Sequence, residues 1–282
     1  MGEAFLEIDI IYSLDDPVGV LASRALVERL RAKPRRCPYA EECFSYERGL
    51  IAGYSGELLN LDILDVSPRS ELRPVIALSR HASRECRGTL SVHHTGNPTS
   101  TVAGGKPFKL AVSYPALAKA LLVEYSKATL EMKLEKDYEL TLEATHHGPT
   151  ETSKPLVFIE VGSCEKQWRD SRAILALVTA VSNVVNNSEN IPACTPAVGL
   201  GGPHYPRRFT KAMLETELCF GHIISKHQLS EAINENTVIQ ALERSYPEPS
   251  RVIIVEKSST NKVVRDALQQ IASIKRVLVE YW

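Results

Sequence analysis

The sequence predicts an α/β protein, a three-layer sandwich in which a mixed central sheet lies between helical layers. Apolar runs with strand-like spacing alternate with segments of helical periodicity along the 282 residues. Hydrophobic residues make up 44% of the chain and charged residues 24%, the composition of an ordinary globular protein that is long enough to bury a core. We expect one domain over residues 1–282, with a possible inserted segment around residues 31–57.

Eight segments have the apolar content or the alternation of β-strands. They are residues 4–12, 58–66, 75–79, 138–145, 156–161, 197–200, 251–255 and 277–281. The second is the least regular because it contains Asp62 and Asp65, whereas residues 156–161 form a compact apolar run.

Four segments have apolar residues at helical spacing. They are residues 18–30, 115–131, 165–185 and 263–272. Pro115 fits the first turn of the second helix, because its missing N–H would be unpaired there in any case. A polar run at residues 186–190 ends the third and longest helix.

Six cysteines are scattered along the chain, and none forms a CxxC pair, so neither a zinc ribbon nor a thioredoxin-like motif is supported. Cys37 and Cys43 lie six residues apart, where a surface disulfide or half of a metal site is conceivable. We expect these two thiols to be unrelated, and most of the six cysteines to be reduced and structural.

No apolar run approaches the length of a membrane span, and the first residues lack the pattern of a signal peptide. We therefore expect a cytoplasmic protein. The net charge of −1 argues against a general nucleic-acid binder. A local basic cluster of Arg207, Arg208 and Lys211 nevertheless follows His204 closely.

Several common catalytic motifs are absent from the sequence or incomplete in it. The glycine-rich segment at residues 199–204 has a histidine in place of the third glycine of a dinucleotide fold, and residues 104–107 lack the remaining parts of a P-loop. Residues 53–57 are not a nucleophile elbow, and HExxH is absent. These absences disfavour NAD enzymes, P-loop NTPases, elbow-type serine hydrolases and thermolysin-like proteases.

Histidines occupy four small polar turns, each preceded by apolar residues. The turns lie at residues 79–83, 92–97, 144–150 and 201–205. Imidazole is suited to proton transfer near neutral pH and to zinc binding, and loops held by a rigid sheet commonly carry such groups. The pattern indicates a hydrolytic active site assembled at strand ends.

Adjacent side chains on a strand point to opposite faces, so we expect one imidazole of the His146–His147 pair to be active and the other to support it or face solvent. A turn at Gly148 relaxes this constraint, and the same reasoning applies to His93 and His94.

Glu160 lies in a strand that otherwise looks fully buried. A buried carboxylate is costly unless it has a cation, a metal or good donors as partners, so we interpret Glu160 as a site residue, with a structural ion pair as the alternative. His222 has apolar neighbours and fits a hydrogen-bonded core position, and His227 fits the surface.

Taken together, six segments resemble the D-aminoacyl-tRNA deacylases of the archaeal and plant type. They are residues 79–83, 93–97, 144–151, 158–163 with Trp168, 199–205 and 220–223. The most specific is 144–151, whereas Pro203 stands where the family pattern has glycine. The recurrent histidine of the second segment aligns with His93, so His94 is not expected to act.

The resemblance implies an enzyme that hydrolyses the ester between a D-amino acid and the terminal adenosine of tRNA, a reaction of translation quality control. It also implies a zinc requirement, a monomer, no evident protein partner, and a phosphorylase/hydrolase-like sheet similar to that of peptidyl-tRNA hydrolases. Ester hydrolysis needs an activated water, an oxyanion-stabilising group and protonation of the leaving oxygen.

On this basis we assign candidate roles to the residues. The catalytic candidates are His81, His93, His147 and Glu160. The candidate zinc ligands are His93, His146 and His204. The candidate substrate contacts are Asn97, Thr150, Gly201, Gly202, Arg207, Arg208 and Lys211. A histidine acting directly, without metal, remains an alternative.

Two other functions remain open. One is a zinc-dependent amidase or peptidase on small substrates, which would be indifferent to tRNA. The other is a non-catalytic tRNA-binding protein in which the histidines only shape a pocket.

Overall fold

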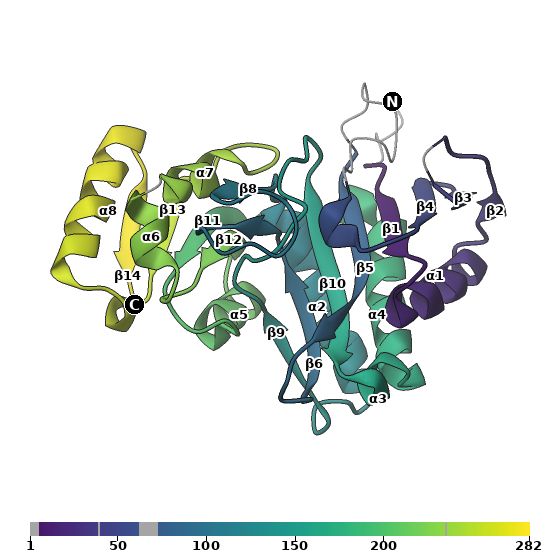
Figure 1. Cartoon of the computed structure of the whole chain (residues 1–282). Helices are drawn as coiled ribbons and strands as arrows, with labels where there is room; N and C mark the ends of the chain where they lie inside the picture. Colours follow the sequence, from purple (N-terminus) through teal and green to yellow (C-terminus); the bar gives the residue numbers. More distant parts are fainter. Residues whose placement is uncertain (1–5, 39, 62–72, 235) are drawn as a thin grey trace.

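The computed structural model describes residues 6–38, 40–61, 73–234 and 236–282, and an eight-stranded sheet forms its larger part (Figure 1). The strand order is β2-β3-β4-β1-β5-β10-β6-β9. Strands β4, β1, β5 and β10 run parallel, whereas β6 is antiparallel to β10 and β3 is antiparallel to β4. The predicted α/β class with a mixed central sheet is therefore confirmed. The strands are β1 (Asp9–Ser13), β2 (Lys33–Pro34), β3 (Glu42–Tyr46), β4 (Gly49–Tyr54), β5 (Val75–Ala82), β6 (Gly88–His93), β9 (Tyr138–Leu142) and β10 (Leu156–Ser163).

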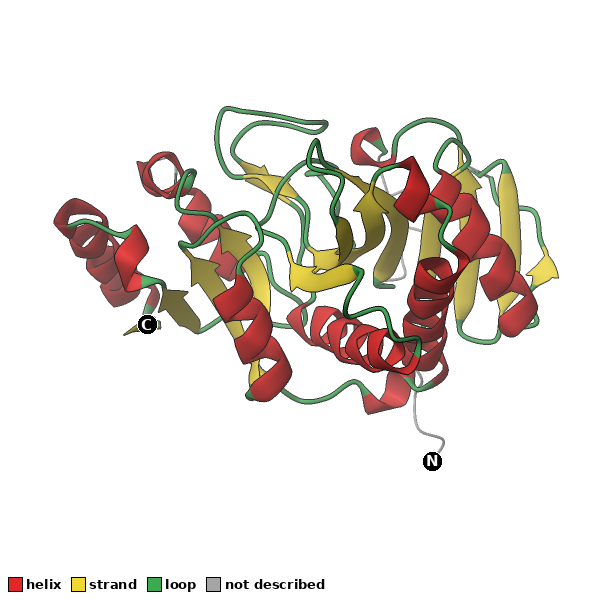
Figure 2. Cartoon of the chain, turned by 90° about the horizontal axis from the view of Figure 1, so that it is seen from below, coloured by secondary structure: helices red, strands yellow, loops and turns green. Residues whose placement is uncertain are grey.

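Three helices cover one face of this sheet: α1 (Pro17–Arg29), α2 (Pro115–Glu131) and α4 (Ser171–Asn186) (Figure 2). Asp16 caps α1 by accepting hydrogen bonds from the amides of Val18 and Gly19. Pro115 begins α2, as the sequence predicts. Alternate residues of the strands pack against these helices, and the residues between them therefore face the other side.

The other face of the sheet carries a smaller apolar cluster. It includes Ala77 and Phe158 from the central strands and Leu58 from a single 3-10 turn, Leu58–Asn60. The described residues of this cluster come from strands, from the Leu58–Asn60 turn and from loops, and none of them lies in a long helix. Loops therefore cover this face of the sheet. The face that the helices leave uncovered therefore has room for a cavity.

A second, four-stranded parallel sheet has the order β12-β11-β13-β14. Its strands are β11 (Thr195–Leu200), β12 (Leu218–Ile224), β13 (Val252–Val255) and β14 (Leu278–Tyr281), and a two-stranded ribbon joins β7 (Gly96–Asn97) to β8 (Lys109–Leu110). The helices α5 (Arg207–Glu215), α6 (Leu229–Asn234), α7 (Thr237–Glu243) and α8 (Lys262–Lys275) accompany this sheet. Ala197, Phe220 and Ile223 of this part share one buried cluster with the helices of the larger sheet. The sequence placed its strands in one central sheet, because apolar spacing does not reveal which strands pair.

Several element predictions need correction. Residues 165–185 form two helices, α3 (Glu165–Trp168) and α4, because Asp170 accepts from the amide of Arg172 and begins a new helix. Residues 58–60 form a 3-10 turn and not a strand, and residues 62–66 of that prediction lie outside the described part of the chain. The segment 31–57 supplies β2, β3 and β4 to the central sheet, and its description as an inserted segment stays a prediction.

The expectation of reduced, unrelated cysteines is wrong. Disulfides join Cys37 to Cys43, Cys86 to Cys164 and Cys194 to Cys219. The second bridge links residues 78 apart, which the fold brings to a Cα–Cα distance of 5.2 Å. Spacing along the sequence could not reveal that proximity.

None of the helices described is both long and apolar enough to cross a lipid bilayer.

Candidate active site

The strand register brings the candidate residues to the face that the helices leave uncovered. In β10, Phe158 pairs with His93 of β6, and Gly162 pairs with His81 of β5. Residues two apart on a strand share a face, so Glu160 lies on the same side as both histidines. A Cβ atom on Gly162 would lie 2.6 Å from the Cβ of His81, so the missing side chain makes room for this imidazole.

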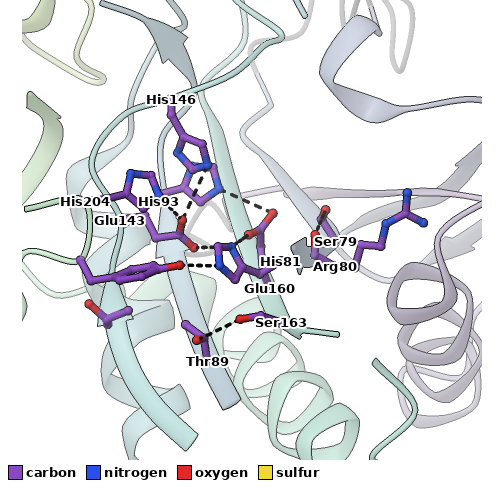
Figure 3. Close-up of polar contacts among 12 residues, drawn as sticks. Ser79, Arg80, His81, Thr89, His93, Glu143, His146, Glu160, Ser163 and His204 are labelled. Atoms are coloured by element: carbon purple, nitrogen blue, oxygen red, sulfur yellow. Dashed lines mark hydrogen bonds and ion pairs between the residues drawn. The ribbon is translucent and has the colours of Figure 1, made fainter. Parts of the chain in front are cut away.

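Glu160 lies between two imidazoles (Figure 3). Its Oε2 is 3.4 Å from Nδ1 of His81, and its Oε1 is 3.6 Å from Nε2 of His93. Burial opposes ionisation of this carboxyl, but hydrogen bonds with the two histidines outweigh it and hold the pKa of Glu160 well below its usual range.

A second buried carboxylate, Glu143, completes the cluster, and sequence reasoning missed it. Its Oε1 is 3.2 Å from Nδ1 of His81, and its Oε2 is 2.8 Å from Nε2 of His204 and 3.6 Å from Nε2 of His146. Despite burial, these imidazoles hold the pKa of Glu143 well below its ordinary value. The alternation of β9 contained the signal, because Leu142 faces the helices and the next residue must face the other side.

His81 is held between the two carboxylates. Burial disfavours its charged form, but hydrogen bonds with Glu143 and Glu160 raise the pKa of His81 to about 11. Its Nε2 lies 2.7 Å from the hydroxyl of Tyr205, a residue that the sequence placed beside His204 without a role. The protonated imidazole can donate to that oxygen, which leaves the hydroxyl proton of Tyr205 free to point elsewhere.

Both members of the His146–His147 pair line the same cavity, so neither ring faces away from it, and which of the two is active stays a prediction. His147 has a φ of 43°, in the left-handed region, and this turn brings its ring to 4.4 Å from that of His146, centroid to centroid. Nδ1 of His146 bonds the carbonyl of Ala144, and Nδ1 of His147 bonds that of Gly148. A carbonyl can only accept, so the second nitrogen, Nε2, carries a lone pair in both rings.

Burial and the neighbouring imidazoles keep both rings of this pair neutral. They lower the pKa of His147 to about 4 and that of His146 well below its usual value. Burial also disfavours the charged form of His93, but the hydrogen bond with Glu160 outweighs it and raises the pKa of His93.

The remaining histidines are structural or exposed. His94 is buried, with Nδ1 on the carbonyl of Gly221 and Nε2 accepting from the amide of Tyr114, so the prediction that it does not act agrees with its contacts. His222 is a buried, hydrogen-bonded core residue and His227 is exposed, which confirms both predictions.

A cavity of about 590 Å³ opens beside the cluster. One wall is apolar and includes Leu58, Leu59, Ala103 and Phe158, and Arg80 forms part of another. Figure 3 shows the imidazoles and carboxylates converging on one another from three strands and the loops beside them, whereas the side chain of Arg80 extends away from them. A small group with an apolar side chain can enter such a space while its polar end meets the cluster.

The donor atoms fit a metal ion. Three sets of groups have ligand atoms within 4.8 Å of one another: His93 with His146 and His147, Glu143 with His146 and His204, and His81 with Glu143 and Glu160. Nε2 of His146 and Oε2 of Glu143 are both acceptors and lie 3.6 Å apart, an arrangement that a cation between them would stabilise. Oε1 of Glu143 and Nε2 of His93 are also buried, and each meets its one charged neighbour, Nδ1 of His81 at 3.2 Å and Oε1 of Glu160 at 3.6 Å, with poor hydrogen-bond geometry. The three predicted zinc ligands do not form one set, since His93 and His204 belong to different ones.

The predicted substrate contacts are not among the residues that line the cavity. The amide of Asn97 donates to the carbonyls of Gly104 and Lys106, and the hydroxyl of Thr150 accepts from the amide of Lys106, so both hold this loop. The amides of Gly201 and Gly202 are already bonded, to the Ile224 carbonyl and the Ser259 hydroxyl.

The three basic residues are exposed on α5 beyond His204. Arg207 pairs with Glu139 at 2.8 Å, and Lys211 lies 3.8 Å from Glu215.

Buried carboxylates and imidazoles around a cavity at the strand ends of an α/β fold define the machinery of a hydrolase. The comparisons with known proteins identify the particular family. A family model described as D-aminoacyl-tRNA deacylase matches residues 69–280. The chain belongs to the D-aminoacyl-tRNA deacylase family.

Individual relatives agree over nearly the full length. A D-aminoacyl-tRNA deacylase of Aeropyrum pernix is 42% identical over 278 residues, which cover 98% of this chain and 100% of the relative. One of Hyperthermus butylicus is 36% identical over 257 residues, which cover 90% and 93%. A crystal structure of a conserved protein of unknown function superimposes with a TM-score of 0.86 at 26% identity, covering 98% of this chain and 95% of that one.

Proposed function

We propose that this protein hydrolyses the ester bond between a D-amino acid and the terminal ribose of tRNA, releasing free D-amino acid and tRNA. The observation that carries the proposal is the coincidence of the family match over residues 69–280 with a cavity lined by His81, His146, His147, Glu160 and His204. The match favours neither a small-substrate amidase nor a non-catalytic tRNA-binding protein. The monomeric state and the cytoplasmic location stay predictions from the sequence.

His147 is the base in this proposal. Its Nδ1 is engaged by the carbonyl of Gly148, and its Nε2 therefore offers a lone pair at the cavity wall. That nitrogen can take the proton of a water molecule as the water attacks the ester carbonyl. The apolar packing of Phe158 against the ring, at 5.1 Å between centroids, fixes its orientation.

His81 and Tyr205 supply the donors. The imidazolium of His81 is stabilised by two carboxylates and donates to the oxygen of Tyr205, which polarises the hydroxyl. A polarised hydroxyl at the cavity wall can donate a hydrogen bond to the oxyanion as the carbonyl is attacked, and it keeps its own proton throughout. The departing ribose oxygen takes the proton that His147 received from the attacking water, which returns His147 to its neutral form.

Zinc, where bound, is assigned to Glu143, His146 and His204. This set contains two of the three predicted ligands, and it leaves His81 and His147 for proton transfer. A zinc ion held by one carboxylate and two imidazoles supplies Lewis acidity and lowers the pKa of a bound water. Glu160 and His93 form the adjoining buried pair that keeps His81 in position.

The deciding experiment compares two histidine variants on D-tyrosyl-tRNA. His147→Asn removes the lone pair in the cavity, and we expect a loss of about 10²- to 10⁴-fold in kcat/KM. His227→Asn changes an exposed histidine outside the cavity and serves as the matched control. Equal activity of the two variants would exclude His147 as the base, and an inactive wild-type protein would exclude the deacylase function.

A further inference from the structure

A second hollow of about 500 Å³ lies on the other side of Arg80, between α1 and α3. Its lining includes Val20, Leu21 and Arg24 of α1, Trp168 at the end of α3, and Arg169. Arg80 lines both this groove and the histidine cavity, so the two spaces adjoin. The mechanism above uses none of the α1 and α3 side chains.

Trp168 gives this groove a fixed aromatic wall. Its indole Nε1 donates to the carbonyl of His81 at 2.7 Å, and the guanidinium of Arg80 lies 5.5 Å from the ring centroid. The ring is therefore tied to the catalytic strand and cannot swing away. Across the groove Leu21 of α1 is 37% exposed and adds apolar surface to the wall opposite Trp168.

The charges around the groove are mixed. Arg24, Arg80 and Arg169 contribute three cations, and Asp15 and Glu165 contribute two anions. Arg80 also pairs with Glu57 at 2.8 Å, and because the Glu57 side chain is 52% exposed, a phosphate can compete with it for this guanidinium. The pair of Arg169 with Glu165 is largely exposed, with 64% and 62% of the side chains accessible, so a phosphate can compete for the guanidinium in water. Aromatic and apolar walls combined with arginines are the features by which proteins hold single-stranded nucleic acid.

We infer that this groove binds the unpaired 3′ nucleotides of the tRNA, immediately before the terminal adenosine whose ester enters the histidine cavity. A base packs between Trp168 and the apolar side of α1, and the backbone phosphates face Arg24 and Arg80. The inference rests on the proposed function and adds to it the place where the protein recognises nucleic acid. It also accounts for tRNA recognition by a chain whose net charge is only −1.

The first test compares two substrates that share the same ester. D-tyrosyl-tRNA reaches both spaces, whereas D-tyrosyl-adenosine reaches only the histidine cavity. We expect Arg24→Gln to raise KM for the tRNA substrate about 3- to 10-fold and to leave kcat/KM for D-tyrosyl-adenosine within twofold. Arg29→Gln, on the same helix but outside the groove, is the matched control and should change neither value.

Trp168 is tested by two substitutions, because its indole also contacts the strand of His81. Trp168→Ala should lower kcat/KM about 10- to 100-fold more for D-tyrosyl-tRNA than for D-tyrosyl-adenosine, since only the tRNA loses a stacking surface. Trp168→Phe keeps a ring but removes the N–H donor, and should restore most of the tRNA-specific loss. Equal losses on both substrates, without rescue by phenylalanine, would assign Trp168 a purely structural role and overturn the inference.

A binding measurement separates this inference from the proposed function. Uncharged tRNA and tRNA lacking its last three nucleotides are titrated against the wild-type protein and Trp168→Ala. The inference predicts that truncation weakens binding to the wild type at least 10-fold and binding to the variant by less than threefold. If truncation has no effect on the wild type, the groove does not bind the 3′ end, whatever the outcome of the activity assays.

Discussion

Glu143 contacts more of the site's imidazoles than Glu160 does, and the substitution Glu143→Gln tests its role most directly. The carboxylate is fully buried and contacts His81 at 3.2 Å, His204 at 2.8 Å and His146 at 3.6 Å. Glutamine has the same shape but no charge, so it removes the charge that holds His81 and His204 without opening a cavity. The change therefore tests charge and orientation separately from packing.

The magnitude follows from these contacts. A hydrogen bond to a charged group stabilises a fold by about 1.5–3 kcal/mol, and breaking a buried ion pair costs about 3–5 kcal/mol. Glutamine keeps one acceptor oxygen and Glu160 still faces His81, so we expect the lower range, a loss of about 1.5–3 kcal/mol in the free energy of unfolding. Loss of a partner that orients such side chains lowers activity about 10- to 100-fold, so kcat/KM should fall by about 10²-fold.

Urea unfolding and release of D-tyrosine from D-tyrosyl-tRNA measure the two effects. The matched control is Glu139→Gln on the same strand, which removes only a partly exposed pair with Arg207 and should cost less than about 1 kcal/mol. If Glu143→Gln lost stability but kept its activity within twofold, the carboxylate would serve folding alone, and the assignment of Glu143 to the site would be refuted.

Four further predictions concern the site and the fold. Gly162→Ala places a Cβ 2.6 Å from that of His81, so deacylation should fall more than 10-fold, and a near-normal rate would show that the strand absorbs the extra atom. If the imidazole and carboxylate groups hold zinc, a chelator should lower Tm and one zinc equivalent should restore it, whereas an unchanged Tm would remove zinc from the account. Neutralising Arg207, Arg208 and Lys211, the predicted substrate contacts on α5, should flatten the dependence of log affinity for tRNA on log salt by about one unit for each phosphate that the protein no longer neutralises, and an unchanged slope would exclude them. Replacing Cys86 and Cys164 by serine opens a loop of 78 residues and should cost about 2–4 kcal/mol in urea unfolding, checked against the oxidised wild type.

The sequence predicted Glu160 and missed Glu143 for a physical reason. An acid inside a continuous apolar run is conspicuous, because burial without a partner is costly. Glu143 follows an alternating strand that already contains an exposed acid, Glu139, and looks like another solvated position. The alternation of β9 puts Glu143 on the face opposite Leu142, but only the fold shows that this face carries the histidines that Glu143 contacts.

Local patterns also failed where backbone geometry decides the outcome. The period of two on a strand predicted that His146 and His147 would separate, but the left-handed φ of His147 brings both rings to the cavity. The helices α1, α2 and α4 and four of the eight strands of the larger sheet, β1, β5, β9 and β10, followed from apolar spacing, since burial on one face imposes it. The pairing of strands into two sheets and the bridges Cys86–Cys164 and Cys194–Cys219 depend on contacts distant in sequence and left no local signal, whereas the spacing of Cys37 and Cys43 allowed the bridge that the structure shows.

The most direct test of the account is the release of amino acid from matched D- and L-tyrosyl-tRNA by the wild-type protein. We expect the wild-type protein to hydrolyse the D-ester and to leave the L-ester intact, and we expect His147→Asn to lose the hydrolysis of the D-ester. Failure to release D-tyrosine, or equal release from both esters, would contradict it.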